Sequence, residues 1–302
     1  MSAARLSPRG LIAGSTAFLI WGLFPVYLHP LSGVPAVQII AHRVAWSCLF
    51  LLLVLLLRGE LSRLPATFAK PRLLAGLAAS AVLISCNWLV YVWSVTHQHI
   101  VESSLGYYIN PLVNVLLGVL VLRERPNRVQ WTAIALAAVA VVYLAVQAGR
   151  PPWIAFALAL SFSLYGFVRK VISIEALPGL ATETLLLLPF ALAYLSWCEH
   201  SGSAAFAHRG AAITALLIGS GIFTAVPLFL FAYGARLLPY STVGVLQYIG
   251  PSLQLACGVL FYDEAFGAAR AAGFALLWAA LILYAGEGLW RARAFARAAA
   301  RA

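Results

Sequence analysis

Apolar runs of about 20 residues follow one another along most of the chain, and they constrain the fold more than any other feature. A helix of about 20 residues crosses the roughly 30 Å hydrocarbon core of a bilayer. Within that core, only helices and closed barrels satisfy all their backbone hydrogen bonds. Barrel strands alternate between apolar and polar residues, and these runs do not. The runs therefore predict an all-α membrane protein.

The composition agrees with this class. Only 10% of the 302 residues are charged, whereas a soluble domain carries about 25%. The net charge is +11, but the basic residues stand between the apolar runs and form no patch with aromatic residues, so we expect no nucleic-acid partner. The four cysteines show no CxxC spacing. We interpret them as small apolar residues and predict no metal site and no cofactor.

Ten of the runs are long enough to be spans, at 11–29, 37–57, 73–95, 101–122, 129–147, 152–172, 179–198, 211–233, 240–261 and 267–288. If the N-terminus is inside the cell, the inside segments hold 16 of the 20 Lys and Arg residues, and the outside segments hold only Arg150, Arg209 and Arg270. Positive residues are retained on the cytoplasmic side. This distribution predicts a multi-pass protein of the inner membrane with both termini in the cytoplasm.

A repeated motif divides the ten spans into two halves. The segments 108–124 and 248–264 align without gaps, and a proline, a glycine and a glutamate recur at the same spacing. Because five spans is an odd number, the second half must enter the membrane inverted. Inverted repeats are typical of secondary transporters, whose halves enclose a site near the midplane. We therefore predict a first repeat at 10–147, a second repeat at 152–288, and a basic cytoplasmic tail at 289–302.

Five motifs are spread over nearly the whole chain: AHRVAWS at 41–47, NWL at 87–89, SLGYYINPLVN at 104–114, SLYGFVRK at 163–170 and QYIGP at 247–251. Their combination resembles the EamA-type drug/metabolite transporter superfamily, and within it the RarD-like, chloramphenicol-sensitivity branch. The resemblance implies a ten-helix permease with two EamA repeats. It also implies a central cavity lined mostly by spans 1–4 and 6–9, with spans 5 and 10 at the periphery.

Two charged residues lie inside predicted spans. A charge near the centre of a membrane helix costs about 2.5–3.5 kcal/mol and usually faces a cavity or a partner. Arg43 is a candidate for contact with a substrate or an anion in the pore. The alternative is a structural role, either as an ion pair, with Glu102 as the candidate partner, or as a side chain that snorkels to the interface. For Glu183, a structural or gating pair with Arg169 or Lys170 is favoured over a role in proton coupling.

Polar residues form stripes on two predicted spans. A serine, a tyrosine and two asparagines recur at helical spacing in 103–114, and two glutamines and a glycine occupy the matching stretch at 247–254. Such groups suit a water-filled passage, although amides also join helices within membranes. Pro111 and Pro251 lie beside the stripes and mark either hinges or static kinks. His42 either titrates near neutral pH or is a hydrogen-bonded core histidine.

The residues predicted to line the cavity, the aromatic ones by stacking on a planar solute, are His42, Arg43, Asn87, Trp88, Tyr107, Asn110, Asn114, Tyr165, Glu183, Gln247, Tyr248 and Gln254.

The sequence contains no ATP-binding loop and no G-x-S-x-G or H-E-x-x-H motif, so we predict no catalytic residue. The predicted function is secondary transport of small organic metabolites or drugs across the inner membrane by alternating access, with membrane lipids as the surroundings. A membrane-embedded enzyme or a lipid-handling protein is the alternative. Coupling to protons or to a counter-substrate, the direction of transport and formation of a homodimer stay open.

Overall fold

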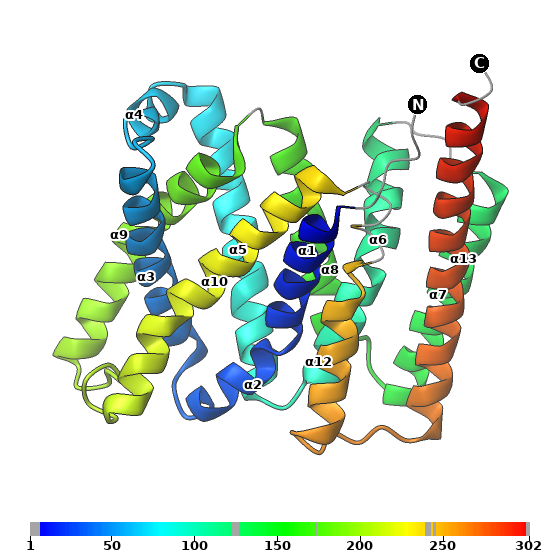
Figure 1. Cartoon of the computed structure of the whole chain (residues 1–302). Helices are drawn as coiled ribbons and strands as arrows, with labels where there is room; N and C mark the ends of the chain where they lie inside the picture. The colour runs from blue at the N-terminus through cyan, green and yellow to red at the C-terminus, as the bar shows by residue number, and fades with distance from the viewer. Residues whose placement is uncertain (1–6, 123–126, 173, 239–242, 244–245, 300–302) are drawn as a thin grey trace. The chain divides into compact units, whose positions relative to one another are not determined.

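The computed structural model describes residues 7–122, 127–172, 174–238, 243 and 246–299, and every regular element in these ranges is a helix (Figure 1). The helices are α1 (Pro8–Gly22), α2 (Phe24–Leu28), η1 (His29–Leu31), α3 (Ala36–Leu57), α4 (Arg63–Phe68), α5 (Pro71–Thr96), α6 (Ile100–Leu122), α7 (Arg128–Ala148), α8 (Trp153–Val171), α9 (Ala176–His200), α10 (Ala211–Leu237), α12 (Ile249–Leu260) and α13 (Ala268–Ala299).

Seven helices in the described ranges are long and apolar enough to cross a membrane, or eight if α1 joins α2 and η1 as one broken span. Helices α8 and α12 contain shorter apolar stretches. The structure therefore confirms a multi-pass helical membrane protein, and the count of ten spans remains a prediction.

Local sequence signals account for several helix ends. Helix α5 starts at Pro71, a position where the missing N–H of proline is not needed. The side chain of Asn127 accepts a hydrogen bond from the backbone N–H of Gln130, and the Gln130 side-chain oxygen accepts one from the backbone N–H of Asn127. The two bonds form a capping box at the start of α7. The same helix is capped at its C-terminus by Gly149, whose φ of 66° is a left-handed conformation that glycine adopts easily.

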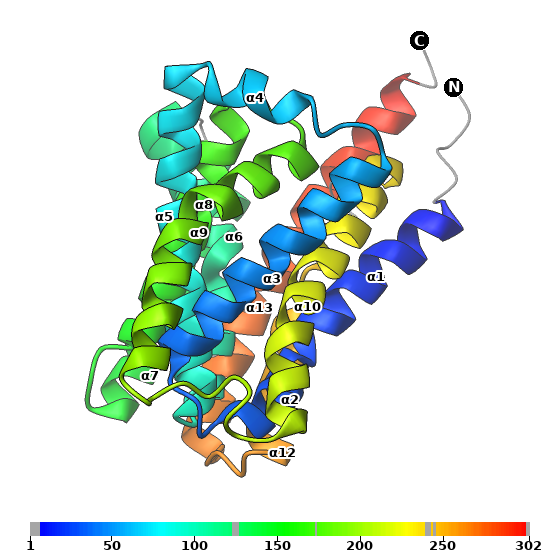
Figure 2. The ribbon, with the colours of Figure 1, turned by 90° about the vertical axis from the view of Figure 1, so that its left-hand side faces the viewer.

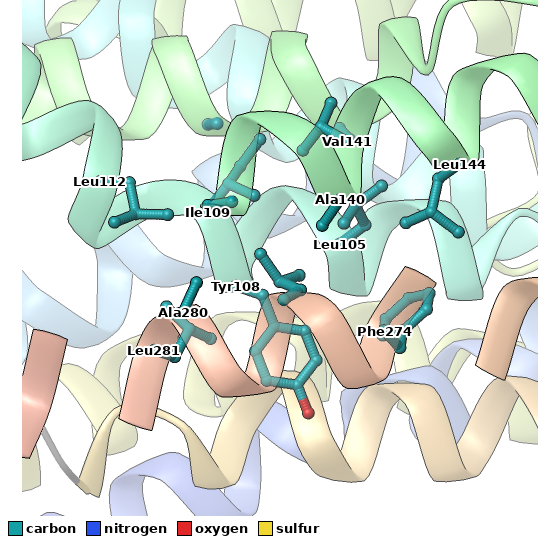
Figure 3. Close-up of a cluster of buried hydrophobic side chains, with 14 of the residues drawn as sticks. Leu105, Tyr108, Ile109, Leu112, Ala140, Val141, Leu144, Phe274, Ala280 and Leu281 are labelled. Atoms are coloured by element: carbon teal, nitrogen blue, oxygen red, sulfur yellow. The ribbon is translucent and has the colours of Figure 1, made fainter. Parts of the chain in front are cut away.

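The helices form two compact units. Unit 1 comprises 1–22, 100–159 and 230–302. In its described part, α7 packs along α13, and both α1 and α6 pack along α12. Figure 3 shows its apolar core, in which Tyr108 and Leu105 of α6, Leu144 of α7 and Phe274 of α13 converge.

Unit 2 comprises 23–99 and 160–229. Here α3 packs along α9, α5 contacts both of them, and the short helix α4 connects α3 to α5 (Figure 2). Helix α10 crosses α3 so closely that a Cβ at Gly221 would collide with the α3 backbone at Trp46 and Ser47. Small residues permit such close helix contacts in membranes. This crossing brings the polar residues of α3 and α10 together.

Each unit takes helices from both sequence halves, and the helices follow a regular spacing. Three helix pairs start 140 residues apart: α3 and α9 at Ala36 and Ala176, α5 and α10 at Pro71 and Ala211, α7 and α13 at Arg128 and Ala268. The same spacing aligns 108–124 with 248–264.

A carboxylate caps the start of α6 in unit 1. Glu264 accepts hydrogen bonds from the backbone N–H groups of Ile100 at 2.5 Å and Val101 at 2.9 Å. The first N–H groups of a helix have no partner within the helix, and its N-terminus attracts negative charge. Burial raises the pKa of Glu264, and the two N–H groups oppose that rise. Through this cap, the connection between α12 and α13 is hydrogen-bonded to the start of α6.

Candidate functional site

Unit 2 holds six of the twelve residues predicted to line a cavity: His42, Arg43, Asn87, Trp88, Tyr165 and Glu183. They lie on α3, α5, α8 and α9, and five of the six are buried, the exception being the half-buried Tyr165. All six therefore lie inside one compact unit.

Arg43 is held by an aromatic and hydroxyl environment. Its guanidinium carbon lies 4.4 Å from the ring centroid of Trp88 and 5.0 Å from that of Phe24. Its Nε donates a hydrogen bond of 2.6 Å to the hydroxyl of Thr224, on α10. Aromatic faces attract a desolvated cation with about 2 kcal/mol. The side chain is only 5% exposed, so these groups replace much of the water that the charge has lost.

Facing polar residues join α5 to α8. The Asn87 amide donates to the Ser161 hydroxyl at 3.0 Å. Ser161, Tyr165 and Arg169 stand four residues apart on α8 and so share one helix face. This face directs a hydroxyl, a phenol and a guanidinium toward α5 and α9.

Glu183 on α9 is the second buried charge, at 1% exposure. Its Oε1 accepts from the Ser80 hydroxyl at 2.5 Å and from Arg169 at 3.4 Å, and its Oε2 accepts from the Tyr165 hydroxyl at 3.4 Å. The predicted pair of Glu183 with Arg169 is confirmed. Three donors thus compensate a carboxylate that would otherwise be costly inside a membrane.

Arg169 reaches Glu183 across a gap in the surface of α9. A Cβ at Gly179 would overlap the Arg169 guanidinium. Only a residue without a side chain leaves this space, so Gly179 sets the path of Arg169 to its partner.

His42 neighbours Arg43 in sequence but has different surroundings. Its ring stacks on Phe206, with centroids 5.1 Å apart, and it lines a pocket of about 270 Å³ between the start of α3, the end of α9 and the segment 204–206. His42 and Arg43 are therefore adjacent in sequence but lie in separate environments.

The other six predicted residues lie in unit 1: Tyr107, Asn110, Asn114, Gln247, Tyr248 and Gln254. Asn110 is buried, Asn114 is exposed, and Gln254 donates to the backbone carbonyl of Trp21 at 3.4 Å. Tyr248 stacks against Tyr108, its counterpart in the repeated motif, with centroids 6.4 Å apart.

The two predicted hinges also lie in unit 1. Pro111 lies inside α6, and Pro251 lies in the first turn of α12, where its missing N–H removes no helix bond.

Glu102, the predicted partner of Arg43, instead binds Arg150 at 2.8 Å and accepts from the backbone N–H of Ile154 at 3.1 Å. It lies in the first turn of α6, next to the start of α8, where a carboxylate meets free N–H groups. Sequence reasoning also missed Thr224 and Ser80 as partners of the buried charges. A lone hydroxyl in an apolar helix gives no signal, because it commonly bonds to its own backbone.

Comparisons with known proteins agree with this picture. The EamA-like transporter family matches residues 8–146. Protein RarD of Streptomyces exfoliatus is 43% identical over 293 residues, covering 97% of this chain and 93% of the relative. An uncharacterised transporter of Pseudomonas aeruginosa is 43% identical over 283 residues (94% and 95%), and protein RarD of Escherichia coli K12 is 40% identical over 290 residues (96% and 98%).

A solved crystal structure shares the fold, with a TM-score of 0.56 at 18% identity, over 91% of this chain and 96% of the other. The sequence similarity extends over nearly the full length of the relatives, which are transporters by name or by family. A multi-pass helical membrane protein with this similarity belongs to the EamA-like transporter family, together with the RarD proteins.

Proposed function

We propose that the protein is a secondary permease that moves small organic metabolites or drugs across the inner membrane by alternating access. In this proposal ten spans form two inverted repeats, at 10–147 and 152–288, followed by the tail at 289–302. The 140-residue spacing of three helix pairs supports the duplication. Helix α1 starts and helix α13 ends on the same side of unit 1, as an even number of crossings requires (Figure 1).

Helix packing supports the inverted arrangement. Counterpart helices pack on each other, α3 on α9 in unit 2 and α7 on α13 in unit 1, as expected when a two-fold axis relates the halves. Ser80 and Ser220 also stand 140 residues apart. Each is fully buried, and its hydroxyl oxygen lies within hydrogen-bond distance of the backbone carbonyl three residues before it, at 3.0 and 2.6 Å.

The buried charges of unit 2 carry the functional proposal. Arg43 and Glu183 are again 140 residues apart, each as the eighth residue of its helix. At 1.5 Å per residue, each lies about 10 Å from the start of its helix. If the helices enter from opposite sides, the two charges bracket the bilayer midplane. Intramembrane charges usually mark a solute or ion pathway.

In this mechanism, Arg43 with Trp88 contacts the solute, and the Arg169–Glu183 pair gates the passage. Trp88 and Phe24 stack on the guanidinium, and Thr224 accepts from its Nε, so the proposal places a held cation where a solute acceptor group would contact it. The polar stripes with Pro111 and Pro251 supply further contacts and the hinges. Proton or counter-substrate coupling is compatible with this arrangement.

The test begins with cells that lack or overproduce the protein. Untargeted comparison of their metabolites identifies the solute whose distribution changes most, and its flux is then measured in proteoliposomes. Arg43→Ala should lower flux by about tenfold or more, the effect of losing one charged hydrogen bond. Arg128→Ala, which removes an exposed arginine at the start of α7, is the control and should transport normally.

Folded protein in the membrane is quantified in parallel. If Arg43→Ala reduces folded protein as much as it reduces flux, Arg43 is a structural residue. If no solute changes its distribution and none crosses proteoliposomes that contain folded protein, the proposed function is wrong.

A further inference from the structure

The pocket beside His42 is built from three pieces of unit 2. Its lining residues are Gln38 and His42 of α3, Leu195, Ser196, Cys198 and Glu199 of α9, and Ala204 and Phe206 of the following segment. The segment is fixed by Gln38, whose side-chain nitrogen donates to the carbonyl of Ser203 at 2.8 Å while its oxygen accepts from the N–H of Ala205 at 3.0 Å. Gln38 thus holds the wall of the pocket in place.

His42 has an unused capacity for hydrogen bonding. The residue is only 6% exposed, and within the described residues no hydrogen bond is found at either ring nitrogen. Neither nitrogen is among the side-chain atoms that are both sealed from solvent and unpaired, so the accessible part of the ring belongs to the pocket. Buried polar groups are nearly always hydrogen-bonded, so such a group calls for an explanation. A neutral imidazole offers one donor and one acceptor nitrogen. Because His42 lines the pocket, a molecule in the pocket can supply the missing partner.

The polar part of the wall favours a positively charged hydrogen-bond donor. Glu199 is the acidic residue of the lining. Its Oε1 pairs with His208 at 2.7 Å, and its Oε2 has no hydrogen bond within the described part of the chain. The Ser196 hydroxyl and the imidazole nitrogen of His42 add two further acceptors. An ammonium group has three N–H donors, which matches these three acceptors in number.

The rest of the wall is apolar. Leu195, Ala204 and Phe206 offer hydrocarbon surface, and the Phe206 ring also attracts a cation. At about 270 Å³ the pocket is slightly smaller than the roughly 300 Å³ at which pockets for drug-sized ligands begin. The occupant must therefore be small.

We propose that this pocket binds a small primary amine with an apolar or aromatic body, its ammonium group at Glu199, Ser196 and His42 and its body against Phe206 and Leu195. The inference deepens the proposed function, since it names a class of solute that the permease would take at one end of α3 and α9.

The test measures binding to the purified full-length protein in neutral detergent by isothermal titration calorimetry. The probes are 2-phenylethylamine, the uncharged 2-phenylethanol and the anionic 3-phenylpropionate. The amine should bind saturably and at least about tenfold more tightly than the alcohol, as expected for a hydrogen bond to a charged group. The anion should bind most weakly.

Glu199→Gln should abolish the preference for the amine over the alcohol. Glu175→Gln is the matched control, because Glu175 stands at the other end of α9, is similarly exposed (60% against 58% of the side chain) and is also ion-paired, to Arg63. A second variant, Phe206→Leu, keeps the carboxylate and should weaken all three probes.

The proposal is overturned if no probe binds saturably, if the alcohol equals the amine, or if Glu175→Gln weakens binding as much as Glu199→Gln. Calorimetry measures binding independently of transport. If the predicted amine binding fails while Arg43-dependent flux is intact, this site is refuted and the permease function stands.

Discussion

Each of the two buried charges in unit 2 is bound by a residue from the other half of the sequence. Arg43 donates to Thr224 of α10, and Glu183 accepts from Ser80 of α5. A hydrogen bond to a charged group contributes about 1.5–3 kcal/mol to stability. The hydrogen bonds of these two charges therefore contribute to the free energy that holds the two sequence halves together.

A substitution at Gly179 tests whether this glycine makes room for the Arg169–Glu183 ion pair. In Gly179→Ala the added methyl group overlaps the Arg169 guanidinium and should displace it from Glu183. We expect a loss of about 1–3 kcal/mol in unfolding free energy, as in other overpacked sites. The measurement is thermal unfolding of the purified protein in detergent.

The control is Gly166→Ala on α8, where nothing lies within 4 Å of the added methyl group. This variant should be neutral or slightly stabilising, since alanine favours a helix over glycine. Equal melting temperatures for the two alanine variants would contradict the assigned role of Gly179.

At this site, the charged residues could be predicted from the sequence, whereas their hydroxyl-bearing partners could not. Arg43 and Glu183 could be predicted because charges are costly in membrane helices and therefore conspicuous. Ser161 could have been found, since it shares one face of a helix with Tyr165 and Arg169. The stacking of Phe206 on His42 could not, because it depends on how the segment after α9 folds back.

Among elements, the predicted spans match helices to within a few residues at most ends, because hydropathy sets helix length in a membrane. Helix α4 was missed, since six residues leave no periodic pattern. The start of α12 at Ile249 was also missed: the predicted span ran through it from residue 240, and part of that stretch lies outside the described residues.

The cap on α6 can be tested at the same scale. Glu264→Ala removes the acceptor of two backbone N–H groups and should lower the unfolding free energy by about 0.5–2 kcal/mol. Hydrogen exchange at residues 100–104 should accelerate. Glu175→Ala is the control, because Glu175 precedes α9 without forming a side-chain cap, and its exposed ion pair contributes little. Unchanged exchange in Glu264→Ala would argue against the cap.

For the whole molecule, hydropathy and repeats predicted the helical membrane class, and similarity to RarD proteins confirmed the family. The interleaving of the two halves within each compact unit could not be predicted. It depends on which helix faces meet, and apolar faces in lipid give little preference for one partner over another.

Splitting the chain tests this organisation. Residues 1–150 and 151–302, co-expressed as separate polypeptides, should co-purify and restore folded protein, because the break falls in an exposed connection. A split between residues 186 and 187, inside α9, should fail. The measurement is affinity capture by a tag on one fragment, followed by size-exclusion chromatography. Fragments that fold but do not associate would contradict the interleaved arrangement.

The equal spacing of Arg43 and Glu183 has an evolutionary consequence. Under the proposed duplication, two antiparallel copies of the first half would bury two guanidinium groups at related positions. The second half supplies its own cation, because Arg169 pairs with Glu183. A first half assembled with itself would therefore be electrically unbalanced, and a fused gene avoids this by delivering one copy of each half to every molecule.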